Sequence, residues 1–137
     1  PKIYLREQRL FLEKRGGCCV ILLPSAVTLS KRVTDKFRYI RSKTGVTNNI
    51  LARIAISLAL ESDQSVEDAN REDSAGQSLD KDLLFGDLAP IYEIAIREYM
   101  LDNDVELSVG GTISSLVEIG AHKMSHIRSL EHFASLS

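Results

Sequence analysis

Apolar residues recur at helical spacing through most of this chain, and they alternate as in a strand over one short stretch. Residues 25–30 alternate weakly between apolar and polar side chains, which predicts a short strand. Val33, Phe37 and Ile40 then follow an i, i+4, i+7 spacing, which predicts a helix over residues 31–43 with one buried stripe. The front of the chain therefore combines a strand with an amphipathic helix.

A second helix is predicted directly after the first. Gly45 stands where a left-handed residue ends the first helix, and Thr47 stands where a capping residue begins the next. Residues 48–60 are apolar over most of the helical circumference, and Arg53 is their only charged residue. Such a helix must be covered on nearly all sides, either at the centre of the domain or in an oligomer interface.

The remaining pattern is also mainly helical. Residues 62–82 are acidic and polar, which predicts a loop. Residues 88–101 predict a third helix with Asp87 as its cap, and residues 112–133 predict a closing helix. The predicted fold is therefore mainly α, a small helical domain in which a short N-terminal strand and a strand-helix-helix unit precede two further helices.

The first residues carry weaker signals. Residues 1–17 predict a short basic helix ended by two glycines, and residues 18–23 predict a buried strand. We expect an N-terminal extension over residues 1–22 and a helical domain over residues 23–137.

The charges are divided unevenly between the two ends of a chain whose formal net charge is −2. Residues 1–60 hold 12 Lys and Arg against 3 Asp and Glu, a balance of +9. Residues 61–137 hold 5 against 16, a balance of −11. Such asymmetry favours a polyanionic partner for the basic half, with nucleic acid before an anionic membrane. The alternative is that the two halves neutralise each other within one fold or oligomer.

Cysteine content and the length of apolar runs bear on the compartment. Cys18 and Cys19 are adjacent and are the only cysteines, so they cannot form a disulfide framework. The longest apolar run spans residues 18–23, which is far too short for a membrane span. We expect a soluble protein in the reducing environment of the cytoplasm, with no membrane partner.

The candidate binding residues lie on the first predicted helix. Four of them follow i, i+4, i+7, i+11 and form one continuous stripe: Arg32, Lys36, Tyr39 and Lys43. Three further cations flank the other side of the apolar stripe: Lys31, Arg38 and Arg41. Only Asp35 opposes these six cations, whereas a face that is charged merely for solubility usually mixes both signs. This pattern indicates contact with a phosphate backbone, and a solvated helix face is the alternative.

The turn before the second helix adds a weaker signal. The first backbone amides of a helix lack intrahelical acceptors, and the helix dipole favours an anion there. Thr47, Asn48 and Asn49 are therefore candidates to hold a phosphate, with ordinary helix capping as the alternative.

Signals for catalysis are weak. His122 and His126 have the i, i+4 spacing of paired metal ligands, but no Glu accompanies them as in HExxH, and we expect exposed polar residues there. The glycine-rich nucleotide-binding motifs and the GxSxG nucleophile motif do not occur. We expect no catalytic residues, no metal and no cofactor.

A family resemblance is carried by segments that run in order along the chain: "KTGVTNNILARIAISLALE", an acidic spacer, "LLFGD", "YEIAIREYM" and "GAHKMSHIRSLEHF". From about Leu23 to the C-terminus, the chain resembles the DNA sulfur modification protein DndE family. Residues 1–22 lie outside this resemblance. The front unit, with "LARIA" in its second helix, also resembles ribbon-helix-helix DNA-binding proteins.

The resemblance implies a specific function. DndE proteins are small components of the bacterial machinery that replaces a non-bridging backbone oxygen of DNA with sulfur, and they act beside sulfur-transfer enzymes and an ATPase. It also implies a homotetramer that binds nicked double-stranded DNA through basic residues. A nicking activity has been proposed for the family, but this sequence shows neither the metal ligands nor the nucleophile for it. We therefore expect a binding role, and a catalytic one is left open.

Two other functions remain open. A ribbon-helix-helix transcriptional regulator would read one palindromic operator through Thr28, Ser30 and Lys31 on paired strands. A protein-binding adaptor of the modification complex would instead use the acidic loop and the last two helices.

Overall fold

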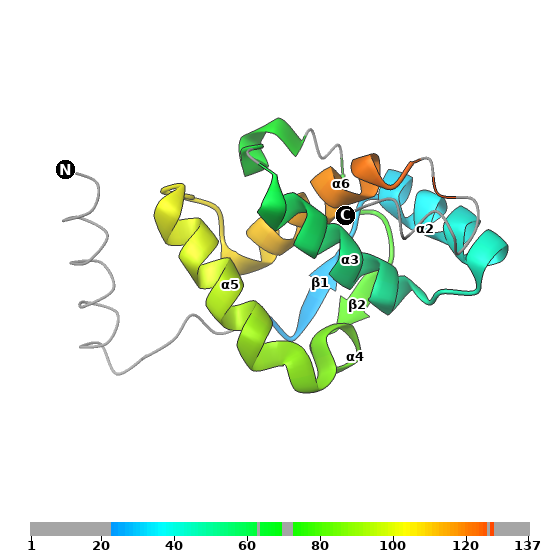
Figure 1. Ribbon diagram of the computed structural model, residues 1–137, viewed down its shortest axis with the longest axis horizontal. Coiled ribbons are helices and arrows are strands. Elements are labelled where there is room, and N and C mark those ends of the chain that lie inside the picture. The colour runs from blue at the N-terminus through cyan, green and yellow to red at the C-terminus, as the bar shows by residue number, and fades with distance from the viewer. Residues whose placement is uncertain (1–22, 63, 70–72, 126, 128–137) are drawn as a thin grey trace.

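The computed structural model describes residues 23–62, 64–69, 73–125 and 127. The predicted helix over residues 1–17 lies outside them, as does the predicted strand apart from Leu23, which packs against the core without regular structure. The described elements, in chain order, are β1 (Ala26–Thr28), α2 (Lys31–Thr44), α3 (Asn48–Glu61), the 3-10 turn η1 (Val66–Ala69), β2 (Ser78–Asp80), α4 (Lys81–Phe85), the 3-10 turn η2 (Gly86–Leu88), α5 (Ala89–Asp102) and α6 (Val109–Lys123) (Figure 1). The fold is mainly helical, as predicted.

The predicted N-terminal strand has a partner that the sequence pattern did not indicate. β1 pairs antiparallel with β2, and Val27 lies opposite Leu79 in the register. Both of these side chains are buried. The prediction of a plain loop over residues 62–82 is therefore wrong in part, since the segment contains η1, β2 and the first residues of α4. β2 has only one apolar residue, so its strand conformation comes from long-range pairing rather than from alternation.

The predicted ends of α2 and α3 are close to those observed. The Ser30 hydroxyl caps α2 by accepting a hydrogen bond from the Val33 amide at 3.2 Å. Gly45 adopts a φ of 77°, and its amide donates to the Arg41 carbonyl, as a left-handed C-terminal cap does. Thr47 occupies the N-cap position of α3, but its side chain makes no capping hydrogen bond.

The helix at the centre of the described fold is α6 rather than α3. Every residue from Thr112 to Ala121 is buried, whereas α3 buries one face and leaves Ile50 exposed. Figure 1 shows α6 crossing behind α3. A Cβ atom on Gly120 would overlap the backbone of Ala55, so the glycine allows α3 and α6 to cross in direct contact.

Two predicted helix boundaries are wrong. α6 begins at Val109 with Ser108 as its cap and ends at Lys123, ten residues before the predicted end; residues 128–133 lie outside the described part. Asp87 does not cap α5, because it lies within η2 and α5 begins at Ala89. In the described part of the chain, no helix is long and apolar enough to cross a bilayer.

Candidate nucleic-acid interface

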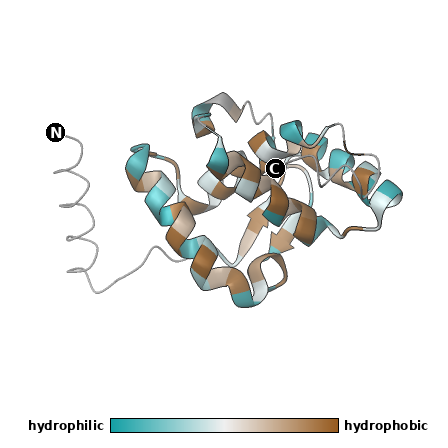
Figure 2. Ribbon diagram, viewed as in Figure 1, coloured by the Kyte–Doolittle hydropathy of each residue, from teal (hydrophilic) through white to brown (hydrophobic). Residues whose placement is uncertain are grey.

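α2 exposes charged side chains on both sides of its buried stripe. Val33, Phe37 and Ile40 face the core, as the sequence predicted. In Figure 2 the α2 ribbon alternates between hydrophilic and hydrophobic residues, whereas α3 is mostly hydrophobic. The two sides of α2 lie in different surroundings, one beside α6 and the other beside a groove.

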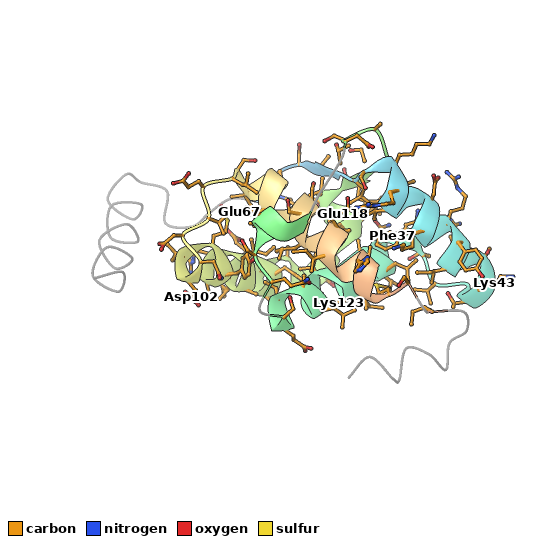
Figure 3. All side chains as sticks on the ribbon, turned by 90° about the horizontal axis from the view of Figure 1, so that it is seen from above. Phe37, Lys43, Glu67, Asp102, Glu118 and Lys123 are labelled. Atoms are coloured by element: carbon orange, nitrogen blue, oxygen red, sulfur yellow. The ribbon has the colours of Figure 1, made fainter. Side chains whose placement is uncertain are left out.

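The predicted stripe, meaning Arg32, Lys36, Tyr39 and Lys43, lies on the side of α2 that approaches α6. Arg32 forms an ion pair with Glu118 of α6, with 3.5 Å between Nη2 and Oε1. The Arg32 side chain is 51% exposed, while that of Glu118 is only 5% exposed. Figure 3 shows Glu118 on α6 between the body of the protein and α2. The nearly buried carboxylate of Glu118 is thus paired with Arg32, the first residue of the stripe.

Lys36 lies next to this ion pair. Partial burial lowers the pKa of its ammonium, and the positive charge of Arg32 lowers it further, while Glu118 acts in the opposite direction. Glu118 therefore offsets part of the effect that burial and Arg32 have on the pKa of Lys36.

The outer end of the stripe is more open to solvent. Tyr39 is exposed, and the Lys43 ammonium lies 5.6 Å from the centroid of its ring, within the range of a cation–π contact. Figure 3 shows Lys43 at the end of α2 that lies farthest from Asp102 of α5. The stripe therefore runs from a partly buried ion pair to an exposed aromatic and cationic end.

The other side of α2 borders a groove of about 520 Å³, called here the α2–α3 groove. Its lining combines all three cations of the second flank with the start of α3 and with residues from the predicted loop: Lys31, Thr34, Asp35, Arg38, Arg41, Asn48, Ala75, Gly76 and Gln77. Arg38 pairs with Asp35 at 3.3 Å, but both side chains are exposed, and such pairs contribute little to stability. The sequence predicted the cations but not the groove.

Residues 73–77 form the fixed wall of the α2–α3 groove. The Asp73 carboxylate accepts hydrogen bonds from the backbone amides of Lys31, at 3.0 Å, and Ala75, at 2.9 Å. These bonds lower the pKa of Asp73 below its ordinary value. Gly76 lies against α2, where a Cβ atom would overlap Thr34 Oγ1 and the Ser30 carbonyl. The wall is therefore anchored to the first turn of α2.

The three residues predicted at the start of α3 have different environments. Asn48 lines the groove, and its Nδ2 donates to Gln77 Oε1 at 2.6 Å. Thr47 is exposed and Asn49 is half-buried, and neither belongs to the groove lining. Of the three, the structure thus brings only Asn48 together with the cations.

The acidic half of the chain does not neutralise most of these cations within the described part. Arg32 and Arg38 have carboxylate partners there, and the Arg38 partner comes from α2 itself. Among the described residues, no carboxylate oxygen lies within 4.0 Å of the charged nitrogens of the other four cations: Lys31, Lys36, Arg41 and Lys43. Five of the six cations are exposed, and Lys36 is half-buried.

The residues expected of a ribbon-helix-helix reader are differently placed. Thr28 pairs with Ser78 of the same chain, and its carbonyl accepts a hydrogen bond from Ser114. Ser30 is buried as the cap of α2. The ribbon is thus formed within one chain and packs against α6.

The described residues contain no group of three or more His, Cys, Asp and Glu side chains that could hold a metal ion. His122 is exposed, and His126 lies outside the described residues. Glu118 was missed by the sequence reasoning, although it is the single charged residue in the apolar stretch 109–121, and that isolation was an available signal.

Comparison with known proteins gives the family. The family model described as DNA sulphur modification protein DndE matches residues 26–129, which include β1 through α6. The chain belongs to the DndE family. A search of curated proteins gave no match. Among solved structures, the chain is similar to the crystal structure of DndE from Escherichia coli B7A, involved in DNA phosphorothioation modification. The two share 28% sequence identity with a TM-score of 0.61, and the similarity covers 73% of this chain and 97% of that chain.

Proposed function

We propose that this DndE family chain is a cytoplasmic, non-catalytic DNA-binding component of the DNA phosphorothioation system. The observation that carries the proposal is a row of six cations along α2, of which five are exposed and Lys36 is half-buried, next to a buried stripe that fixes the helix to the core. Arg and Lys on one helix suit the phosphate backbone, because each neutralised phosphate releases condensed counterions. Binding of this kind positions a protein on the duplex without reading its sequence.

The stripe and the start of α3 are the proposed contacts with double-stranded DNA, together with the cations of the α2–α3 groove. Chemistry at a backbone atom requires a protein that holds phosphates rather than base edges. The proposed duplex is nicked, because stacking alone holds the strands together at a break, and such a duplex bends at low cost against a curved positive surface. The sulfur-transfer enzymes and the ATPase of the system are the proposed protein partners.

The proposed assembly is a homotetramer. Its support in the structure is an apolar face on α5, where Ile91 and Ile94 are exposed at i, i+3 and are preceded by the exposed Leu88 of η2. Exposed apolar residues on one side of a helix are typical of protein interfaces. Symmetric copies of the chain would join several α2 surfaces into one wide cationic surface.

The test is binding of the purified protein to continuous, nicked and palindromic duplexes of equal length at two salt concentrations, with its mass in solution measured in parallel. The proposal expects similar binding to unrelated sequences, tighter binding to the nicked duplex and a steep loss of affinity with salt. A strong preference for one palindrome would instead support the transcriptional regulator. Retention of a protein partner with no DNA bound at either salt would support the adaptor.

A further inference from the structure

The α2–α3 groove differs in shape from the stripe on the other side of α2. The stripe is a row of side chains on one helix, which suits a backbone that runs past it. The groove is concave, and its volume of about 520 Å³ lies in the range of small-ligand sites. A concave site accepts a chemical group that projects from the rest of its molecule. The groove therefore suits the end of a nucleic acid strand better than the middle of one.

Among the described residues that line the groove, three cations outnumber one carboxylate. Asp73, in the adjoining wall, interacts electrostatically with Lys31 and lowers the formal balance from +2 to +1. Lys31 and Arg41 are ten residues apart, about 15 Å along the helix axis at 1.5 Å per residue, so the positive charge is spread along the groove. Asp35 is already paired with Arg38, so it does not oppose the other two cations directly.

The wall of the groove is held in place by hydrogen bonds within the protein. Gly76 donates its amide hydrogen to the Leu29 carbonyl at 2.9 Å, and Gln77 donates to Thr34 Oγ1 at 2.9 Å. The hydrogen bond between Asn48 and Gln77 joins this wall to α3. A preformed site avoids the entropic cost of ordering a loop around the ligand.

The two helix N-termini near the groove differ in one respect. Asp73 already accepts the hydrogen bond of the Lys31 amide at the start of α2, so the protein supplies the anion at that end. Asn48, the first residue of α3, faces the groove. The positive end of the α3 dipole therefore reinforces the positive charge of the groove cations. The first residue of α3 carries no carboxylate that plays the part Asp73 plays at the start of α2.

We propose that the α2–α3 groove binds a phosphate monoester at the end of a nucleic acid strand. A monoester carries about −1.5 to −2 at pH 7 and an interior diester about −1, so the positive lining attracts the monoester more strongly, and only a terminal group projects from the nucleic acid strand into a concave site. The assignment rests on the proposed DNA-binding function, since it takes DNA as the source of the strand end. It adds a second kind of contact to that function, one that recognises where a strand stops.

The test uses the full chain and two gapped duplexes that differ only in a 5′-phosphate or a 5′-hydroxyl at the gap, with the continuous duplex as reference. The wild-type protein should bind the phosphorylated gap about five- to tenfold more tightly than the hydroxyl gap at 0.1 M salt, since one net additional cation–phosphate contact at a slope near 0.9 contributes about eightfold. Arg41→Gln should abolish this difference, and it should weaken binding to the continuous duplex no more than Lys43→Gln does. The matched variant Lys43→Gln, which alters the stripe, should weaken all three duplexes to a similar extent and preserve the difference.

Equal wild-type affinity for the two gapped duplexes overturns the groove assignment, while binding to the continuous duplex keeps the proposed function intact. Loss of the difference in Lys43→Gln but not in Arg41→Gln also overturns it. Absence of binding to every duplex rejects both proposals. A mononucleotide 5′-phosphate added alone serves as the last probe, and NMR chemical shifts of the Gly76, Gln77 and Asn48 amides report its binding. If these amides shift but the protein does not distinguish the two gapped duplexes, the groove binds a free nucleotide instead of a strand end.

Discussion

Glu118 provides a specific test of how the stripe is organised. It is 5% exposed on α6, and its Oε1 lies 3.5 Å from Nη2 of Arg32. If the stripe binds DNA, this carboxylate competes with a phosphate for the same guanidinium. Glu118→Gln keeps the shape of the side chain and removes the competing charge, so we expect tighter binding to double-stranded DNA.

The size of the expected gain in DNA affinity follows from one additional phosphate contact. Each contact contributes about 0.9 to the slope of log affinity against log salt. Across the tenfold change from 1 M to 0.1 M salt, one contact corresponds to about an eightfold gain in affinity at the lower salt. The free energy of unfolding should change by less than about 1 kcal/mol, because Arg32 is half-exposed and the loss of a buried charge offsets the loss of the ion pair.

Fluorescence anisotropy with a labelled duplex between about 0.03 and about 0.3 M salt, half a decade to either side of 0.1 M, measures the slope and the affinity together. Glu98→Gln is the matched control, since it changes the net charge equally at an exposed position on α5. Its effect should stay within about twofold because the exposed charge is largely screened. Unchanged or weaker DNA binding by Glu118→Gln would refute the competition between Glu118 and a DNA phosphate for Arg32. An equal gain in affinity in both variants would show that only the net charge of the protein matters.

Three further predictions concern stability and assembly. Gly120→Ala should lower the free energy of unfolding by about 1–3 kcal/mol or more in chemical denaturation, because its Cβ would overlap the backbone of α3, while Gly110→Ala in the same helix meets only ordinary contacts and should be neutral or stabilising. Asp73→Ala should lower the melting temperature at neutral pH, because two backbone hydrogen bonds stabilise the ionised carboxylate and lower its pKa in the folded protein. The stability that Asp73 contributes is therefore fully present above the unfolded pKa of 3.8 and is lost as the pH falls through the lower pKa of the folded protein. The difference in melting temperature between the variant and the wild type should disappear over that pH range. Ile91→Glu with Ile94→Glu should reduce the mass in solution measured by light scattering, and an unchanged mass would exclude the α5 face from the assembly.

Local sequence signals were sufficient for the front helices. Val33, Phe37 and Ile40 are separated by helical spacing and all face the core, so the same spacing placed five of the six cations on exposed sides, while Lys36 is half-buried. Gly45 is the left-handed cap that its position indicated. These features depend on neighbours within a few residues, which a pattern can represent.

The features that were missed depend on residues far apart in sequence. Asp73 bonds to Lys31 across 42 positions, and no periodic pattern reports such a contact. The same holds for the pairing of Leu79 with Val27, which turns a polar stretch into a strand. The α2–α3 groove exists because of these long-range contacts, so the sequence provided its cations without its shape.

The apolar content of a helix was also an incomplete guide to its position. Residues 48–60 contain fewer polar residues than most helices, yet α6 is the one covered on all sides. Gly120 explains the difference, because a glycine at the crossing brings the two backbones together. A close backbone approach depends on the partner helix, and the sequence of one helix does not define it.

The most direct test of the proposed function compares the wild-type protein with the triple variant Arg32→Ala, Lys36→Ala and Lys43→Ala on one continuous duplex across a salt titration, with Lys81→Ala and Lys123→Ala combined as the control. The loss of up to three phosphate contacts should reduce the slope of log affinity against log salt by up to about 2.7 and weaken binding to every sequence, while the control should keep the wild-type slope. A triple variant that folds normally and retains the wild-type affinity and slope would contradict the assignment of α2 as the DNA-binding surface.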